Sequence, residues 1–442
     1  MRITRGQVYF RHARYYGDLL VSSSERFVGG DPRSALAVID GSWENIRSGF
    51  AWASETTDSE PHAAALCIRY PSVPAILELR LPPAERCDWY AAMLRASQAI
   101  GDKRAECRAA NELGIAERAR GRLERAAELH GLAIQLAREL GDRRAEAAAT
   151  GNLGVVSQRS GDYQRALELY EWDLEVAREL GDRHGEHAMI GNIASVHSEM
   201  GDAECALGHL QSALAIAVEI GDRSGESRIL GNIGVCLGTL GDFHGAVQHH
   251  EMDLAISREM NDRQSEAWAL SGMGIAHRAL GNTGIALDLC ERALSLSRET
   301  GDPFLEAQSL RGIGELQQDA GDLRACMASY EAAFEIASAM GDREGQLIIK
   351  LRIGETYRIL GESTPAAEVL DEVAKGARAL GLRVLEALAT WETGALLEQS
   401  SDLRGALRVM ESSLALQQAL ALPDVEKNTE IVARLRARVL SS

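Results

Sequence analysis

Few side chains in this 442-residue sequence have the type and spacing that catalysis or metal binding requires. His184 and His187 lie three residues apart, and His249 and His250 are adjacent. A zinc site needs three or four ligands in a tetrahedral arrangement, and no HExxH motif brings two of them onto one helix face. We therefore interpret the four histidines as ordinary helix residues and predict no metal site.

The glycine and cysteine patterns likewise point to no cofactor and no catalytic nucleophile. Gly231, Gly234 and Gly238 are spaced somewhat like a dinucleotide-binding loop, but they lie within a helical repeat and do not follow a strand. The sequence contains neither GxxxxGK(S/T) nor GxSxG. Its seven cysteines are scattered without a CxxC pair, which excludes a disulfide scaffold and fits a reducing cytoplasm. We predict a cytoplasmic protein that is not an enzyme and binds no cofactor.

The negative charge of the chain disfavours two classes of partner, nucleic acids and anionic membranes. The 47 Lys and Arg residues stand against 65 Asp and Glu, for a formal charge of −18. Nucleic acids and anionic membrane surfaces both attract clustered positive charge. No apolar run approaches the ~18 residues of a membrane-spanning helix, and the start of the sequence lacks the apolar core of a signal peptide. We predict a protein or peptide partner, with no nucleic acid and no membrane.

A repeat of twenty residues runs through most of the sequence. From residue 101 to residue 381, every twentieth residue is Gly in fourteen of fifteen cases, and the next residue is Asp in eleven. Gly adopts the left-handed conformation that ends a helix, and Asp caps the helix that follows. Asn261, the one exception, is the next most tolerant residue at such a turn. The pattern predicts successive helices of ~25 Å with no sheet.

Alternate helices differ in sequence, so the repeating unit is forty residues long. One helix carries a column of small residues that includes Gly154 and Gly314, and the next carries a column of alanines that includes Ala126 and Ala166. Glycine inside a helix costs about 1 kcal/mol relative to alanine. Its recurrence once per unit therefore predicts a close approach between neighbouring helices.

The pattern N-L-G-x6-G-D-Y-x2-A-x3-Y, from Asn152 to Tyr170, resembles the tetratricopeptide repeat (TPR). The forty-residue unit is similar to the long-repeat subclass of Pins/LGN-type and rapsyn-type scaffolds. The resemblance implies an all-α fold, a right-handed TPR superhelical solenoid of about eight helix-turn-helix repeats with helical caps at both ends. The predicted repeats are 103–142, 143–182, 183–222, 223–262, 263–302, 303–342, 343–382 and 383–422.

The two ends depart from this period. Residues 1–102 are predicted to form an irregular helical cap that ends in a divergent TPR-like helix, with helices near 4–27, 32–39, 42–56, 60–69 and 83–99. Residues 423–442 are predicted to form a capping helix with Val425, Ile431, Leu435 and Val439 on its apolar face. Its basic residues leave a docking helix open as the alternative.

The N-terminal segment FRHARYYGDLL, together with Trp43–Arg47 and Phe50–Ala53, resembles the helical region that precedes the TPR sensor arm of bacterial STAND-type regulators. That resemblance implies an alternative function. The chain would be a sensor arm that binds a small inducer or peptide, with the ATPase and output domains absent from it.

The TPR resemblance implies that the first helix of each pair lines a concave groove that binds extended protein segments. We predict a non-enzymatic scaffold in signal transduction, either monomeric or weakly self-associating. Asn side chains in the groove would contact a peptide backbone or, alternatively, the neighbouring helix pair, and Arg side chains would favour an acidic segment. The predicted groove residues are Asn152, Asn192, Asn232, Arg228, Arg278, Arg311, Arg352 and Arg358, with Gln158, Ser195, His197, His277, Gln318 and Tyr357 nearby.

Overall fold

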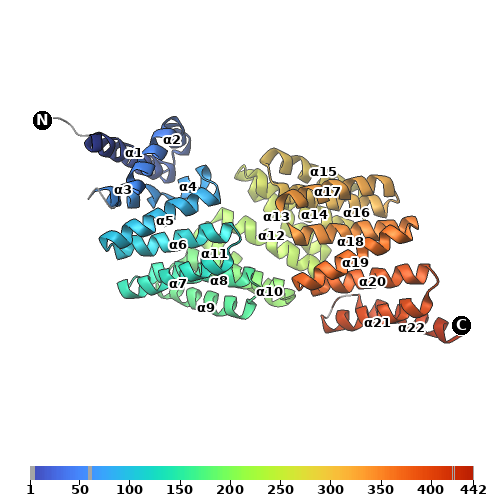
Figure 1. The fold of residues 1–442 in the computed structure, drawn as a ribbon. Helices are drawn as coiled ribbons and strands as arrows, with labels where there is room; N and C mark the ends of the chain where they lie inside the picture. The colour runs from blue at the N-terminus through green and yellow to red at the C-terminus, as the bar shows by residue number, and fades with distance from the viewer. Residues whose placement is uncertain (1–4, 58–61, 421, 423, 442) are drawn as a thin grey trace. The chain divides into compact units, whose positions relative to one another are not determined.

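The computed structural model describes residues 5–57, 62–420, 422 and 424–441. These residues form helices and turns without a strand, which confirms the all-α prediction. The helices fall into two compact units, unit 1 (Met1–Gly221) and unit 2 (Asp222–Ser442), and each is described by itself (Figure 1). No helix among the described residues combines the length and apolarity of a bilayer-crossing segment.

Unit 1 begins with irregularly spaced helices and continues with regular pairs. Its elements are α1 (Arg5–Val28), α2 (Pro32–Glu55), α3 (Ala63–Arg69), the 3-10 helix η1 (Tyr70–Ser72), α4 (Pro74–Arg80), α5 (Pro83–Ile100), α6 (Lys103–Ala119), α7 (Leu123–Leu140), α8 (Arg143–Arg159), α9 (Tyr163–Glu179), α10 (Arg183–Glu199) and α11 (Ala203–Ile220). In each regular pair the even-numbered helix is called the first helix and the odd-numbered one the second.

Unit 2 continues with the same alternation of first and second helices. Its elements are α12 (Arg223–Thr239), α13 (Phe243–Glu259), α14 (Arg263–Ala279), α15 (Thr283–Thr300), α16 (Pro303–Asp319), α17 (Leu323–Met340), α18 (Arg343–Leu360), α19 (Ser363–Leu380), α20 (Arg383–Gln399), α21 (Leu403–Ala419) and the final helix α22 (Val425–Ser441). Within each unit, each first helix packs against the second helix that follows it, and each second helix packs against the next first helix of the same unit.

The turns between helices are closed as the sequence predicts. Gly141, at one of these turns, has a φ of 65°. Asn261 occupies the only one of the turn positions from 101 to 381, taken every twenty residues, that is not glycine, and its φ is 56°. The following aspartate caps the next helix; Asp142 Oδ1, for example, accepts a hydrogen bond of 3.1 Å from the Ala145 N–H. The turn therefore satisfies backbone groups at the end of one helix and at the start of the next.

The glycines inside the first helices allow close packing of large second-helix side chains. A Cβ atom on Gly154 would lie 2.6 Å from a ring carbon of Tyr170, and the same distance separates Gly314 from the ring of Tyr330. Both tyrosines are completely buried. The predicted close approach between neighbouring helices is confirmed. It is made by a tyrosine ring of the second helix, which lies against the backbone of the first helix at its glycine.

The predicted helices 32–39 and 42–56 form one continuous helix, α2, so the predicted break was wrong. Ile39, Ile46 and Phe50 are buried along one face of α2, and packing of this face outweighs the cost of Gly41 in the helix. Helix α4 was not predicted; it begins at Pro74, where the missing N–H of proline costs no hydrogen bond. The predicted helix at 60–69 appears from Ala63, and residues 60 and 61 lie outside the described residues.

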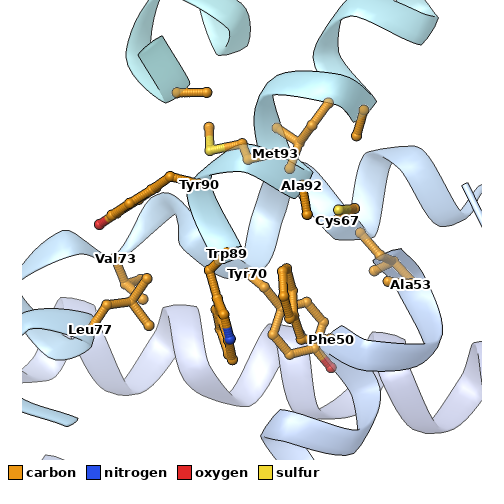
Figure 2. Packing of buried hydrophobic residues seen from close by; sticks show 14 of the residues in the cluster. Phe50, Ala53, Cys67, Tyr70, Val73, Leu77, Trp89, Tyr90, Ala92 and Met93 are labelled. Carbon is orange, nitrogen blue, oxygen red and sulfur yellow. The ribbon is translucent and has the colours of Figure 1, made fainter. Parts of the chain in front are cut away.

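An aromatic cluster forms the core of the N-terminal helices. The indole of Trp89 stacks on the Phe50 ring with centroids 3.9 Å apart (Figure 2). The Tyr70 ring packs edge-on against the same indole. The Tyr70 hydroxyl donates a hydrogen bond of 2.6 Å to the Ala13 carbonyl, which ties α1 to the cluster. This core continues without a break to Leu113 of α6, so the N-terminal helices cover the end of the first regular pair.

The C-terminal helix packs as a cap on α21. Val432 and Leu435 are buried against this neighbour, while Ile431 is partly buried, so the apolar face is turned slightly from the one predicted. Arg436 pairs with Glu411 and Arg438 with Glu398. Two of the basic side chains thus have carboxylate partners within the chain, whereas Lys427 and Arg434 lie exposed, and the capping role stays a prediction. Residue 423 of the predicted cap lies outside the described residues.

Ser401 is a non-glycine residue in a left-handed turn, with a φ of 66°. Side chains with a Cβ atom are strained in this conformation by roughly 1–2 kcal/mol. We expect Ser401→Gly to stabilise the protein by about 1 kcal/mol, measured by chemical denaturation. Asn261→Gly is the matched control and should have a smaller effect, because Asn tolerates this conformation. Equal effects of the two substitutions would contradict the explanation.

Candidate functional site

Polar side chains connect successive first helices on the face where the predicted site residues lie. In unit 1, Asn152 on α8 donates a hydrogen bond of 3.2 Å to Asn111 on α6. Gln158, also on α8, donates to Ser195 at 3.1 Å and to Glu199 at 2.6 Å on α10. These helices therefore present a row of amide and hydroxyl groups, as the sequence indicates for the first part of the groove.

The three predicted asparagines have different surroundings. Asn152 is half-buried and bonded to the neighbouring helix pair, which is the structural alternative considered for this column. The amide nitrogen of Asn192 contacts only the sulfur of Met189, at 4.0 Å, among the described residues. Asn232 on α12 is exposed. Among the described residues, neither Asn192 nor Asn232 forms a hydrogen bond through its side chain with another amide or a carbonyl, and their role in binding stays a prediction.

Three of the predicted arginines converge on one carboxylate in unit 2. Glu315 of α16 contacts Arg278 of α14 at 2.7 Å, Arg352 of α18 at 3.2 Å and Arg311 of its own helix at 3.5 Å. The Glu315 side chain is only 13% exposed. We call Glu315 and these three residues the arginine cluster. The structure brings together residues that are 74 positions apart in the chain, from Arg278 to Arg352.

Further carboxylates neutralise the arginine cluster from outside. Asp319 contacts Arg278 at 2.7 Å, and Glu355 contacts Arg352 at 2.9 Å. Burial disfavours the charged form of Arg352, but the carboxylates of Glu355 and Glu315 dominate and raise its pKa above the usual value. Burial in turn raises the pKa of Glu355, against the opposing effect of Arg352. The guanidinium group of Arg352 therefore stays charged at every physiological pH.

The remaining two predicted arginines lie outside this cluster. Arg358 pairs with Glu392 of the next first helix at 2.8 Å. Arg228 lies exposed on α12 and takes part in none of these ion pairs. Of the nearby residues, Gln318 accepts a hydrogen bond of 3.2 Å from the Tyr330 hydroxyl and serves the helix packing.

A cavity of about 300 Å³ opens beside the arginine cluster, between α16, α17 and α18. Its apolar wall is formed by Phe304, Ala307, Met340 and Ile348, and Arg311 lies at its edge. The exposed ring of Trp268 stacks on Phe304 with centroids 5.8 Å apart, which extends the aromatic surface toward α14. Asp342 and Glu344 also line the cavity, so the site joins an apolar cavity to one guanidinium group and two carboxylates.

The histidines considered from the sequence have different surroundings: His184 is exposed, whereas His187 is buried. His249 bonds the Gly245 carbonyl at 2.9 Å, whereas His250 is buried and its pKa is lowered to about 4. In unit 1 a different group, His197, Asp202 and Cys205, places potential ligand atoms within 4.8 Å of one another. The carboxylate of Asp202 already caps α11, and its hydrogen bond with the Cys205 thiol raises the pKa of that thiol.

Comparison with known families explains this architecture. The tetratricopeptide repeat family model matches residues 92–179, 186–259 and 265–339, which together make up more than half of the chain. The chain belongs to the tetratricopeptide repeat family. No curated protein matches the sequence.

Several solved TPR structures share the fold at low sequence identity. A Rap protein complexed with competence and sporulation factor is 13% identical, with a TM-score of 0.59, and the match covers 82% of this chain and 99% of that one. The Rap conjugation gene regulator of the plasmid pLS20, in complex with the Phr* peptide, is 11% identical with a TM-score of 0.57, covering 77% and 96%. A STAND protein with a TPR sensor from Pyrococcus horikoshii is 12% identical with a TM-score of 0.54, covering 98% and 68%. At these identities the likeness establishes the fold alone.

Sequence reasoning missed the acidic half of the arginine cluster. Glu315 and Glu355 occupy a TPR position that is apolar in other repeats, such as Val155, Val235 and Ile275. A carboxylate at this position in the repeats that carry the arginines was a visible signal that the arginines are paired within the chain.

We expect Glu315→Ala to destabilise unit 2, because three arginines would lose their common partner in a largely buried place. Breaking such a pair costs roughly 3 kcal/mol. Asp288→Ala is the control, since Asp288 is 67% exposed in its pair with Arg292, and such surface pairs contribute less than about 1 kcal/mol. Thermal unfolding followed by circular dichroism checks both. If the two variants melt alike, Glu315 does not hold the cluster together.

Proposed function

We propose that this TPR protein is a non-enzymatic scaffold that binds an extended peptide along its first helices, and that the arginine cluster recognises an acidic group of that peptide. The observation that carries the proposal is the position of Arg311, which belongs to the cluster and also lines the apolar cavity of about 300 Å³. An apolar pocket with a few convergent polar groups is the common form of a ligand site. Here the charged lining residues are Arg311, Asp342 and Glu344, and only Arg311 can pair with an acidic group. The Rap conjugation gene regulator of pLS20, which was solved in complex with the Phr* peptide, is similar in fold and supports a peptide as the ligand.

Glu315 would hold the arginines in position until a ligand arrives. Arg311 has the longest of the three contacts with Glu315, at 3.5 Å, and its side chain is 27% exposed. A ligand carboxylate can therefore approach Arg311 while Arg278 and Arg352 keep their carboxylate partners. Because such charge-assisted bonds are local and the chain carries a net charge of −18, binding should weaken as salt screens the bond.

The second candidate function is the sensor arm of a STAND-type regulator, located in the cytoplasm. The observation that favours it is the match to the Pyrococcus horikoshii STAND protein, which extends over 98% of this chain and so includes the N-terminal helices. Under this hypothesis a small inducer or peptide binds the TPR surface and acts on an ATPase domain that these 442 residues do not contain. Co-purification with such an ATPase, dependent on residues 1–102, would favour this function.

The main test is selection from a displayed library of random peptides, followed by affinity measurements on the enriched sequences. We expect Arg311→Lys to weaken the selected peptide about tenfold, or ~1.4 kcal/mol, because Lys keeps the charge but loses the forked donors. The melting temperature should stay unchanged, since a cation still faces Glu315. Arg292→Lys on α15 is the matched control. If no peptide is enriched, or if Arg311→Lys binds normally, the proposed function fails.

The asparagines provide an independent test. We expect Asn192→Ala and Asn232→Ala to weaken binding of the same peptide without lowering the melting temperature. The reason is that neither side-chain amide forms a hydrogen bond with another amide or a carbonyl of the described residues. Asn152→Ala should lower the melting temperature instead, since Asn111 loses its partner, at a cost of about 1 kcal/mol. The opposite pattern would make Asn192 and Asn232 structural residues and remove them from the groove.

A further inference from the structure

A buried carboxyl group in unit 1 has no partner. Asp173 on α9 is 8% exposed, and it forms no hydrogen bond or ion pair with any described residue. Burying a charged group without compensation is strongly unfavourable. Most repeats carry alanine or another uncharged residue at this position, for example Ala133, Ala213 and Ala293. The acid at 173 is therefore not required by the packing of the repeat.

The same position eighty residues later shows how the fold satisfies such an acid. Asp253 on α13 accepts hydrogen bonds from the hydroxyls of Ser227 and Ser257. The residues equivalent to these serines around Asp173 are Ala147 and Ala177. The two sites have the same backbone framework, and only the one at Asp173 lacks donors.

Asp173 lines an open cavity of about 620 Å³ between α8, α9 and α10. A Cβ atom on Gly151 would lie 2.4 Å from Asp173 Oδ2, so only glycine there leaves room for the carboxyl. The sulfur of Met189 also borders this space, and Met189 in turn contacts the predicted groove residue Asn192. The cavity thus lies next to the predicted groove, and the missing donors can be supplied from it.

The charged groups around the cavity favour a cation at its base. Asp182, which caps α10 through the Gly185 N–H, adds a second carboxylate. Arg183 is engaged by Glu186 and Glu219, while Arg144 and His184 lie exposed at the edge. Burial, together with the charge of Asp182, raises the pKa of Asp173 to about 7. A cation that pairs with Asp173 would remove this penalty.

We propose that this cavity binds the primary ammonium group of a peptide ligand, with Asp173 as its carboxylate partner. The ammonium group supplies three hydrogen-bond donors. The carboxylate of Asp173 can accept from them, because Ala147 and Ala177 have no side-chain donor to occupy it. The inference rests on the proposed function, because it names a second feature of the same peptide. It concerns a separate subsite, since Arg311 and the arginine cluster belong to unit 2. The ammonium comes from the N-terminus or from a lysine side chain.

The test uses the full chain labelled with carbon-13 at its methionine methyl groups and reads the Met189 signal, assigned with Met189→Leu. The probes are Ala-Ala-Ala-amide with a free N-terminus, acetyl-Ala-Lys-Ala-amide, and acetyl-Ala-Ala-Ala-amide as the uncharged control. Comparing the two charged probes shows whether the cavity binds an N-terminal ammonium group or that of a lysine side chain. We expect at least one charged probe to shift Met189 and the uncharged probe not to do so.

Matched variants connect this response to the carboxyl group. Asp173→Ala should weaken the charged probe about tenfold or more, whereas Asp253→Ala removes the same charge in unit 2 and should leave the response unchanged. Binding to the wild type should also strengthen from pH 5 to pH 8, as Asp173 loses its proton. An unshifted Met189 signal, or equal shifts in wild type and Asp173→Ala, overturns the proposal. A charged probe that shifts Met189 while library selection yields no peptide would leave the subsite intact and reject only the proposed function.

Stability gives a second readout that needs no ligand. A raised folded-state pKa means that Asp173 contributes stability below its unfolded pKa, and that this contribution is lost as pH rises toward 7. Asp173→Ala should therefore melt higher than wild type at pH 8, with a smaller difference at pH 5. Asp253→Ala should melt lower, because two buried serines lose their acceptor. If Asp173→Ala melts lower than wild type at pH 8, Asp173 is satisfied by the fold and the subsite is rejected.

Discussion

The structure depends on one local constraint, the left-handed turn that ends each regular helix. A residue with positive φ closes the helix, and in most turns the aspartate that follows caps the next one. Because the turn recurs every twenty residues from 101 to 381, it sets the helix length and hence the register in which neighbouring helices meet. The close contact between Gly154 and the Tyr170 ring requires this register, since a shift of one residue would place a side chain against the ring.

The fixed framework leaves other positions free to vary, and the candidate site occupies those positions. The first helices of unit 1 carry amides such as Asn152 and Gln158, whereas those of unit 2 carry paired arginines and glutamates. Since each repeat contacts mainly its neighbours, these substitutions are tolerated without changing the fold. Glu315 shows how such a substitution is compensated, because its largely buried carboxylate is surrounded by arginines.

The two proposed recognition features are both explained by incomplete pairing within the chain. Arg311 is held loosely by Glu315 beside an apolar cavity, and Asp173 is buried without donors beside another. Buried polar groups in proteins are nearly always hydrogen-bonded. A buried polar group such as Asp173 that lines a cavity without a partner is therefore a reason to look for a ligand. At the equivalent position the fold supplies two serine hydroxyls as donors to Asp253, so it can satisfy an aspartate there without a ligand.

The sequence by itself determined the helices, their turns and the all-α class, because these follow from local backbone preferences that recur every twenty residues. It also located the arginines at 278, 311 and 352, but it could not show that they converge on Glu315. Local preference likewise failed at Gly41, where burial of Ile39 and Ile46 against neighbouring helices keeps α2 continuous. Only the tertiary structure decided which charges are paired, and that Asp173 has no partner among the described residues. Pairing depends on distances between side chains of different helices, and a repeat pattern specifies the positions of residues without specifying their partners.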